Sequence, residues 1–141
     1  MAEAETRSSQ RRIFPPPVTP ETQKFWDAAA SGKLLYGFCN DCKEPHYFPR
    51  PHCPFCFSDS VTWKQASGRA TIYTYSVMRR SPTGPYAIAY VTLAEGPNIL
   101  TNIVDSDLDA IRIGQAVELV FKPSEGGPPV TPSANRRAGR R

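Results

Sequence analysis

The four cysteines of the chain form two Cys-x-x-Cys pairs, "CNDC" at residues 39–42 and "CPFC" at residues 53–56, separated by ten residues. A Cys-x-x-Cys turn brings two sulfur atoms to one ion, and two such turns complete the tetrahedral shell that zinc prefers. We therefore predict a structural zinc site with the ligands Cys39, Cys42, Cys53 and Cys56. Because four thiolates also bind iron, a rubredoxin-like iron site is the alternative.

Other uses of paired cysteines fit this sequence less well. Disulfide bonds need an oxidising compartment, and the N-terminal stretch "MAEAETRSSQRR" contains no apolar signal-peptide segment. A redox Cys-x-x-Cys begins a helix in a βαβ unit, a pattern that residues 39–56 lack. His46 and His52 lie between the pairs, but four cysteines already fill the shell. Such a closed site stabilises a module too small to bury a core of its own and is not catalytic.

The composition is that of a globular protein without a membrane span. The chain has 141 residues, 40% of them hydrophobic, and no apolar run approaches the roughly 20 residues needed to cross a bilayer. We expect a cytoplasmic protein. The net charge of +4 comes from the ends: residues 1–12 carry +1 and residues 134–141 carry +4, which leaves −1 for residues 13–133. The folded part is therefore not basic, which argues against nucleic-acid binding.

Residue patterns divide the chain into a helix, a metal-binding module and a β-domain, between two disordered ends. We predict a disordered arm over residues 1–18 and a disordered basic tail over residues 124–141. A helix is expected over residues 19–32, where Thr19 can cap the first turn and Gly32 can end the last. The metal-binding module covers residues 33–62 and the β-domain residues 63–123.

The β-domain is predicted to contain about five strands. A first hairpin turns at Ser67-Gly68, a second turns at Glu95-Gly96-Pro97, and a last strand runs over residues 117–122. Five strands are too few for an immunoglobulin-type sandwich but suit a small closed barrel such as an OB-fold. The expected fold class is therefore mainly β.

The sequence shows no catalytic motif outside the cysteine module. It contains no Gly-rich phosphate loop, no nucleophile elbow and no spare cysteine. Arg79 and Arg80 precede the flexible loop "SPTGP", where a basic pair can meet an anionic ligand such as a CoA phosphate. An ordinary exposed strand end is the other interpretation of this pair.

Three stretches together resemble a known bacterial and archaeal family. They are "FWDAAASGKLLYGFCNDCKEPHYFPRPHCPFC", "GRATIYTYSVMRR" and "PYAIAYVTLAEGPNILTNIV". Members of that family join a rubredoxin-like zinc ribbon to an OB-fold, and the resemblance covers roughly residues 20–123. One departure concerns the first cysteine turn, where Glu44 stands in place of a frequent glycine.

The resemblance implies a role in acyl-CoA metabolism. Members of the family are small non-catalytic partners of thiolase-fold enzymes, such as the benzylsuccinate-pathway thiolase or steroid side-chain aldolases. They dock the catalytic subunit and help to hold the CoA ester. On this hypothesis Phe25 and Trp26 are candidate anchors for the partner, because aromatic residues dominate many interfaces. The isolated chain would then have no activity.

A second hypothesis is a single-stranded nucleic-acid-binding module, since zinc ribbons and OB-folds both serve that function. Tyr73, Tyr75 and Phe121 could stack on bases. A third is a free-standing redox protein, which would require iron in the cysteine site.

Overall fold

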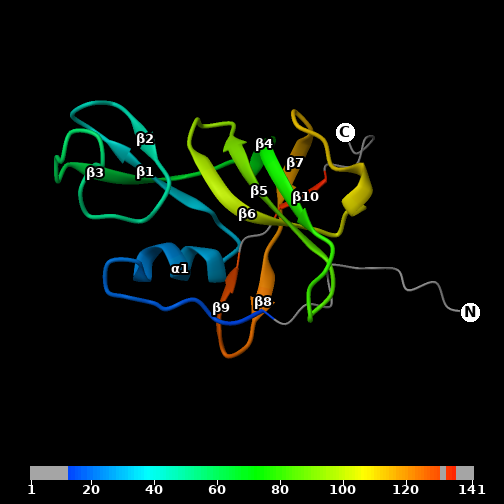
Figure 1. Cartoon of the computed structure of the whole chain (residues 1–141). Helices are drawn as coiled ribbons and strands as arrows, with labels where there is room; N and C mark the ends of the chain where they lie inside the picture. The colour runs from blue at the N-terminus through cyan, green and yellow to red at the C-terminus, as the bar shows by residue number, and fades with distance from the viewer. Residues whose placement is uncertain (1–12, 131–132, 136–141) are drawn as a thin grey trace, which may run out of the picture.

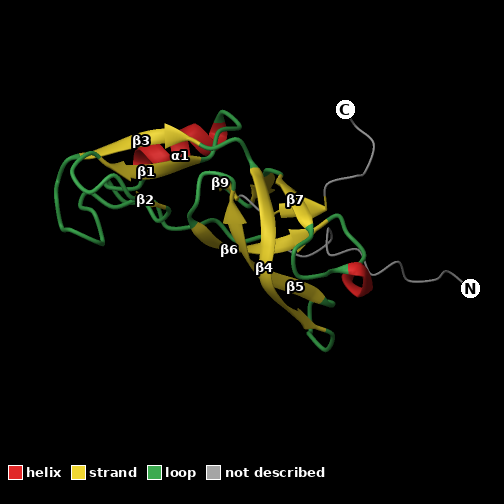
Figure 2. Ribbon diagram, turned by 90° about the horizontal axis from the view of Figure 1, so that it is seen from above, coloured by secondary structure: helices red, strands yellow, loops and turns green. Residues whose placement is uncertain are grey.

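The computed structural model describes residues 13–130 and 133–135. It contains a helix, a three-stranded sheet, a closed barrel and a two-stranded hairpin. Figures 1 and 2 both show the three-stranded sheet and the helix on one side of the molecule and the barrel on the other. The mainly β fold class with a helix, a ribbon and a barrel is confirmed.

Helix α1 spans Gln23–Ala30 and is shorter than the sequence predicts at its N-terminus. Thr19 does not cap it. The hydroxyl of Thr22 instead accepts a hydrogen bond from the backbone N–H of Thr19 at 3.0 Å, so residues 19–22 form a separate turn. The end of the helix matches the prediction. Gly32 has φ +76°, and the N–H of Lys33 bonds to the carbonyl of Ala28 at 2.9 Å, as in a Schellman motif.

The first sheet has the strand order β2-β1-β3 and carries the metal-binding module predicted over residues 33–62, which we call the ribbon. Its strands are β1 (Leu35–Cys39), β2 (Pro45–His46) and β3 (Val61–Gln65), all antiparallel to their neighbours. The hairpin predicted at Ser67-Gly68 is wrong. β3 pairs with β1, whereas the strand after the turn pairs within the barrel. Residues 66–68 therefore connect the sheet to the barrel.

The barrel has the closed strand order β10-β6-β5-β4-β7 (Figure 1). Its strands are β4 (Arg69–Met78), β5 (Tyr86–Leu93), β6 (Asn98–Val104), β7 (Ala116–Leu119) and β10 (Ser133–Asn135). The hairpin predicted at residues 95–97 is confirmed between β5 and β6. A short helix, η2 (Leu108–Ala110), connects β6 to β7. The parallel pairing of β10 with β6 closes the five-stranded OB-type barrel.

The segment after residue 123 differs from the disordered tail that its composition predicts. β8 (Lys122–Ser124) and β9 (Gly127–Val130) form a hairpin, and β10 lies between β6 and β7. The hairpin contacts α1 and the stretch before it. The N–H of Glu125 bonds to the carbonyl of Ile13 at 3.1 Å. The tertiary pairing thus overrides a Pro- and Gly-rich local sequence. The rest of the two predicted disordered ends, residues 1–12, 131–132 and 136–141, lies outside the described residues.

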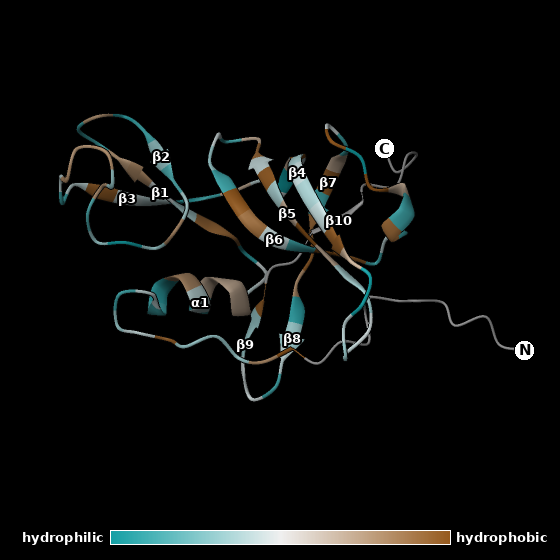
Figure 3. Cartoon of the chain, viewed as in Figure 1, coloured by the Kyte–Doolittle hydropathy of each residue, from teal (hydrophilic) through white to brown (hydrophobic). Residues whose placement is uncertain are grey.

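One hydrophobic core joins the first sheet, the helix and the barrel. Phe25, Leu34 and Tyr36 belong to the same buried cluster as the inward-facing barrel residues, which include Ile72, Val91 and Ile103. Figure 3 shows hydrophobic stretches within the barrel strands. The N–H of Ser67 donates to Oε1 of Glu95 at 2.7 Å, which ties the connecting residues to the β5–β6 turn. Because the core is shared, the ribbon and the barrel are expected to unfold together.

Candidate metal centre and barrel surface

The four predicted cysteine ligands converge on one point. Their Sγ atoms all lie within 4.8 Å of one another. The pairs Cys39–Cys56 and Cys42–Cys53 each have a sulfur–sulfur separation of 3.6 Å. A tetrahedron with Zn–S bonds of about 2.3 Å has sulfur atoms about 3.8 Å apart, so the geometry fits a zinc ion. His46 and His52 are not part of this cluster.

Two equivalent backbone turns position these sulfur atoms. The N–H of Lys43 bonds to the carbonyl of Cys39 at 3.0 Å, and the N–H of Phe57 bonds to the carbonyl of Cys53 at 2.9 Å. Both residues have left-handed backbones, with φ values of +63° and +62°. We call these turns the first and the second knuckle. Glu44 is not a positive-φ residue, so its departure from glycine is not strained in this way.

The electrostatics of the four-cysteine cluster also favour a bound cation. The backbone N–H of Cys42, which donates to the sulfur of Cys39, lowers the pKa of Cys39 to about 7. A backbone hydrogen bond at Glu44 lowers the pKa of Cys42, but burial and the neighbouring sulfurs outweigh it and raise that pKa to about 12. Four close thiolates repel one another unless a cation lies among them. A bound zinc ion would supply that charge and fix the two knuckles together.

His46 lies in β2, paired with Gly37 of β1, the strand that ends at the metal ligand Cys39. Its side chain is buried, and neither ring nitrogen has a hydrogen-bond partner among the described residues. Burial, together with the charge of Arg50, lowers the pKa of His46. The imidazole is therefore neutral at pH 7 and acts as a packing group.

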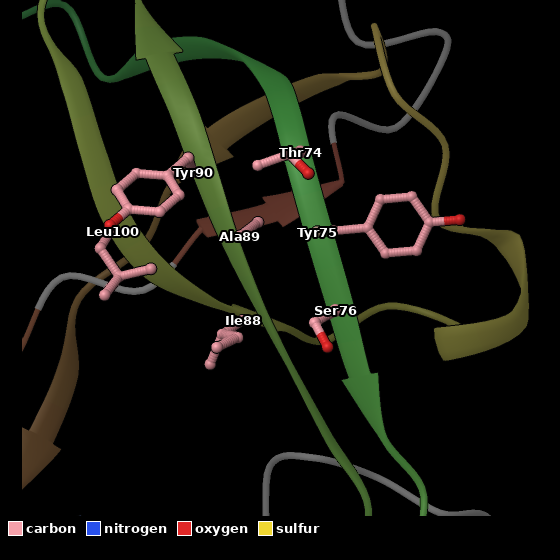
Figure 4. A pocket seen from close by; sticks show the side chains of 7 residues that line it. All are labelled: Thr74, Tyr75, Ser76, Ile88, Ala89, Tyr90 and Leu100. Carbon is pink, nitrogen blue, oxygen red and sulfur yellow. The ribbon is translucent and has the colours of Figure 1, made fainter.

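A shallow hollow of about 170 Å³ lies on the outer face of the barrel (Figure 4). Figure 4 shows Tyr90 and Leu100 side by side, with Tyr75 pointing the other way. Ile88, Tyr90 and Leu100 are 38%, 47% and 55% exposed. The lining residues come from β4, β5 and β6: Thr74, Tyr75, Ser76, Ile88, Ala89, Tyr90 and Leu100. We call this feature the barrel hollow. The sequence analysis did not predict it, because the alternation of Ile88 and Tyr90 with alanines does not show which face of β5 is exposed.

The hollow overlaps the face on which OB-folds bind their ligands, because four of its lining residues come from the second and third barrel strands, β5 and β6, and three from the first, β4. None of its lining residues is charged. A nucleic-acid-binding face would combine aromatic residues with a basic groove. The hollow is therefore better suited to an apolar or uncharged group than to a polyanion.

The other predicted site residues are not gathered at the hollow or the metal centre. Phe25 is 2% exposed and packs edge-to-face against Trp26 at 4.9 Å, so it belongs to the core and is not an accessible anchor. Trp26 is half-buried. Arg79 and Arg80 are exposed at the end of β4, and Arg79 forms an ion pair with Asp109 at 2.7 Å.

No helix among the described residues combines the length and apolar character that crossing a membrane requires.

Family models identify both parts of the chain. The rubredoxin-like zinc ribbon domain of ChsH2 matches residues 26–62, and the C-terminal OB-fold domain of ChsH2 matches residues 63–122. A DUF35 domain-containing scaffold protein from Pyrococcus furiosus is 37% identical over 109 residues, covering 72% of this chain and 79% of the relative. A probable enoyl-CoA hydratase alpha subunit from Thermomonospora curvata is 32% identical over 120 residues. That match covers 82% of this chain but only 38% of the length of the relative.

Solved structures agree. A chain of the Ltp2-ChsH2(DUF35) aldolase superposes with a TM-score of 0.75 and 28% identity, over 85% of this chain and 98% of that chain. A DUF35-family protein from Sulfolobus solfataricus shares the fold at a TM-score of 0.64 and 15% identity, over 84% of this chain and 87% of the other. The matched regions contain the cysteine cluster and the barrel described above. The chain therefore belongs to the DUF35 family of ChsH2-type zinc ribbon and OB-fold proteins.

Proposed function

We propose that this protein is a non-catalytic, zinc-binding accessory subunit of an acyl-CoA enzyme whose catalytic chain has the thiolase fold. The observation that carries the proposal is the match over 85% of the chain to a component of a two-protein aldolase. The names scaffold protein and hydratase alpha subunit, borne by two relatives, support the same kind of role. The reaction would be thiolytic or retro-aldol cleavage of a carbon–carbon bond.

The chemistry of the chain supports a role without catalysis. All four cysteines in the sequence belong to the metal cluster, so none is left as a separate nucleophile. Zinc held by four protein ligands has no open position for water or substrate. The metal would therefore supply folding energy and a rigid ribbon, while the reacting groups would come from the partner.

The barrel hollow and the exposed arginines are the proposed contacts to the complex. An uncharged group of the catalytic subunit or of the acyl-CoA fits the chemistry of the hollow, which Ile88, Tyr90 and Leu100 dominate. Arg79 and Arg80 would hold a CoA phosphate, as guanidinium groups do in charge-assisted hydrogen bonds. Asp109 competes for Arg79, since the two side chains form an exposed ion pair.

Affinity purification of the tagged full-length chain from its host, followed by mass spectrometry, tests the proposal. We expect an acyl-CoA enzyme subunit in near-equal amount, and cleavage activity only when the two chains are combined. Turnover of a CoA ester by the pure chain alone would contradict the non-catalytic role. The accessory role would be refuted if the chain eluted without any acyl-CoA enzyme. It would also be refuted if the chain eluted with nucleic acid that stays bound through a high-salt wash.

Arginine substitutions test the CoA contact in the reconstituted complex. The Arg79→Ala/Arg80→Ala variant is expected to raise KM for the CoA ester about tenfold, because two charged phosphate contacts are lost. Asp109→Asn is the matched control, since it frees Arg79 from its partner. It is expected to lower KM or leave it unchanged.

A further inference from the structure

The second knuckle carries two large apolar side chains that the fold leaves in solvent. Phe55 and Phe57 are 63% and 79% exposed, and they flank the exposed ligand Cys56. Figure 1 shows the loops of the ribbon at the end of the molecule that is remote from the barrel. No element of the described chain covers these two rings.

Phe57 is unfavourable at its position for two reasons. Its backbone has φ +62°, a left-handed conformation that glycine and asparagine adopt readily and bulky residues rarely do. Its ring also exposes apolar surface to water, which burial against a partner would remove.

The first knuckle shows that the turn itself does not require an aromatic residue. Lys43 occupies the equivalent position with φ +63° and the equivalent hydrogen bond. Lys43 is exposed, so its ammonium group lies in solvent, where a charge is favourable. The knuckle geometry therefore accounts for the backbone at residue 57 but not for the phenyl ring.

The net charge of residues 33–62 indicates which kind of partner can bind next to Phe55 and Phe57. Lys33, Lys43 and Arg50 balance Asp41, Glu44 and Asp59 over residues 33–62. Four thiolates around one zinc ion then make the module negative by two charges. A polyanion such as a nucleic acid is repelled, whereas an uncharged protein pocket gains from burying two rings.

We propose that Phe55 and Phe57 of the second knuckle are the aromatic anchors by which this chain docks into an apolar pocket of its catalytic subunit. This inference rests on the proposed accessory function and assigns it a surface. Docking would cover Cys56, so the complex would also shield the metal centre from water and oxidants.

The test compares Phe57→Gly with Lys43→Gly. Both variants give glycine to a left-handed position, and both are expected to keep one zinc per chain and an unchanged or higher Tm. The probe is the purified acyl-CoA enzyme subunit that co-elutes with the tagged chain, and the dissociation constant is measured by titration calorimetry. We expect Phe57→Gly to weaken binding about 30-fold, the loss usual for a buried aromatic anchor, and Lys43→Gly to change it less than twofold. Phe55→Ala is expected to weaken binding about tenfold.

The other results are equally informative. Wild-type affinity in Phe57→Gly would overturn the docking surface while the accessory function stands. Equal losses in Phe57→Gly and Lys43→Gly would overturn it too, because they would place the effect in the knuckle backbone. Self-association of the wild-type chain that Phe57→Gly abolishes in sedimentation would assign the rings to a second copy instead. Absence of any wild-type binding would refute the accessory function itself.

Discussion

The imidazole of His46 occupies the space where a side chain at position 37 would lie. A Cβ atom on Gly37 would fall 2.2 Å from Nε2 of His46, and the two residues are paired between β1 and β2. Position 37 lies in β1, the strand that leads into the first knuckle. It has no room for a methyl group, so only glycine fits there without a shift of His46. This contact connects the metal centre to the packing of the sheet.

Gly37→Ala is expected to destabilise the protein by about 1–3 kcal/mol, since the buried ring of His46 must move. Urea denaturation of the zinc-loaded protein measures this change. The double variant Gly37→Ala/His46→Ala should lose less stability than the sum of the two single variants, because removing the ring removes the clash. Strict additivity would show that the two residues do not interact.

Cys53→Ser is expected to abolish zinc binding and to destabilise the protein by at least roughly 3 kcal/mol, since the metal supplies much of the folding energy of the ribbon. Metal analysis and thermal denaturation give the two readouts. The exposed His52 lies outside the cluster, so His52→Ala should retain one zinc per chain. Normal stability in metal-free Cys53→Ser would contradict a structural role for the site.

Acidification is expected to destabilise the native protein through His46. Its folded-state pKa lies below the usual 6.5, so above pH 6.5 the ring is neutral in both states and has no effect. As the pH falls below 6.5 the unfolded chain takes up a proton that the folded chain refuses, and stability decreases until the folded-state pKa is passed. His46→Met should therefore show a smaller drop in its urea midpoint between pH 7.5 and 5.5 than the wild type. Zinc release, followed in both proteins, serves as the common reference.

Removal of β10 should open the barrel. A chain ending at residue 130 leaves β6 and β7 without the strand that lies between them, so we expect a loss of at least roughly 2 kcal/mol and a tendency to aggregate. A chain ending at residue 135 keeps β10 and is the matched control. Thermal denaturation and light scattering compare the two. Similar stability of both truncated chains would show that β10 is dispensable.

The Arg79–Asp109 ion pair should contribute little to stability. Both side chains are more than half exposed, at 64% and 72%, so Arg79→Ala is expected to change the unfolding free energy by less than about 0.5 kcal/mol. Chemical denaturation at low and high salt measures it. A larger loss would mean that any effect of this variant on CoA binding reflects folding.

Local sequence signals predicted the metal centre and the helix end well. Cys-x-x-Cys spacing determines where sulfur atoms can meet, and the left-handed conformation of Gly32 ends α1 through local backbone hydrogen bonds. The allocation of strands could not be predicted in the same way. Ser67-Gly68 is typical of a hairpin turn, but β3 pairs with β1, whose residues lie 22 to 30 positions earlier in the chain.

The last barrel strand and the candidate surface residues also depend on tertiary contacts that the sequence does not reveal. Residues 133–135 form a strand because β6 and β7 present open edges to them, a condition that no three-residue pattern reveals. Phe25 is conspicuous in the sequence, and only the packing of α1 on the sheet shows that it belongs to the core. The exposed rings of Phe55 and Phe57 likewise became visible only with the knuckle backbone in place.

The position of β10 also sets the order in which the protein can be made. During synthesis, β4, β5, β6 and β7 leave the ribosome before residues 133–135. The edges of β6 and β7 therefore stay unpaired until β10 has been made. The ribbon, by contrast, has its four cysteines and β3 in place by residue 65. Zinc can therefore bind the four cysteines while the chain is still growing, and barrel closure becomes the last folding step.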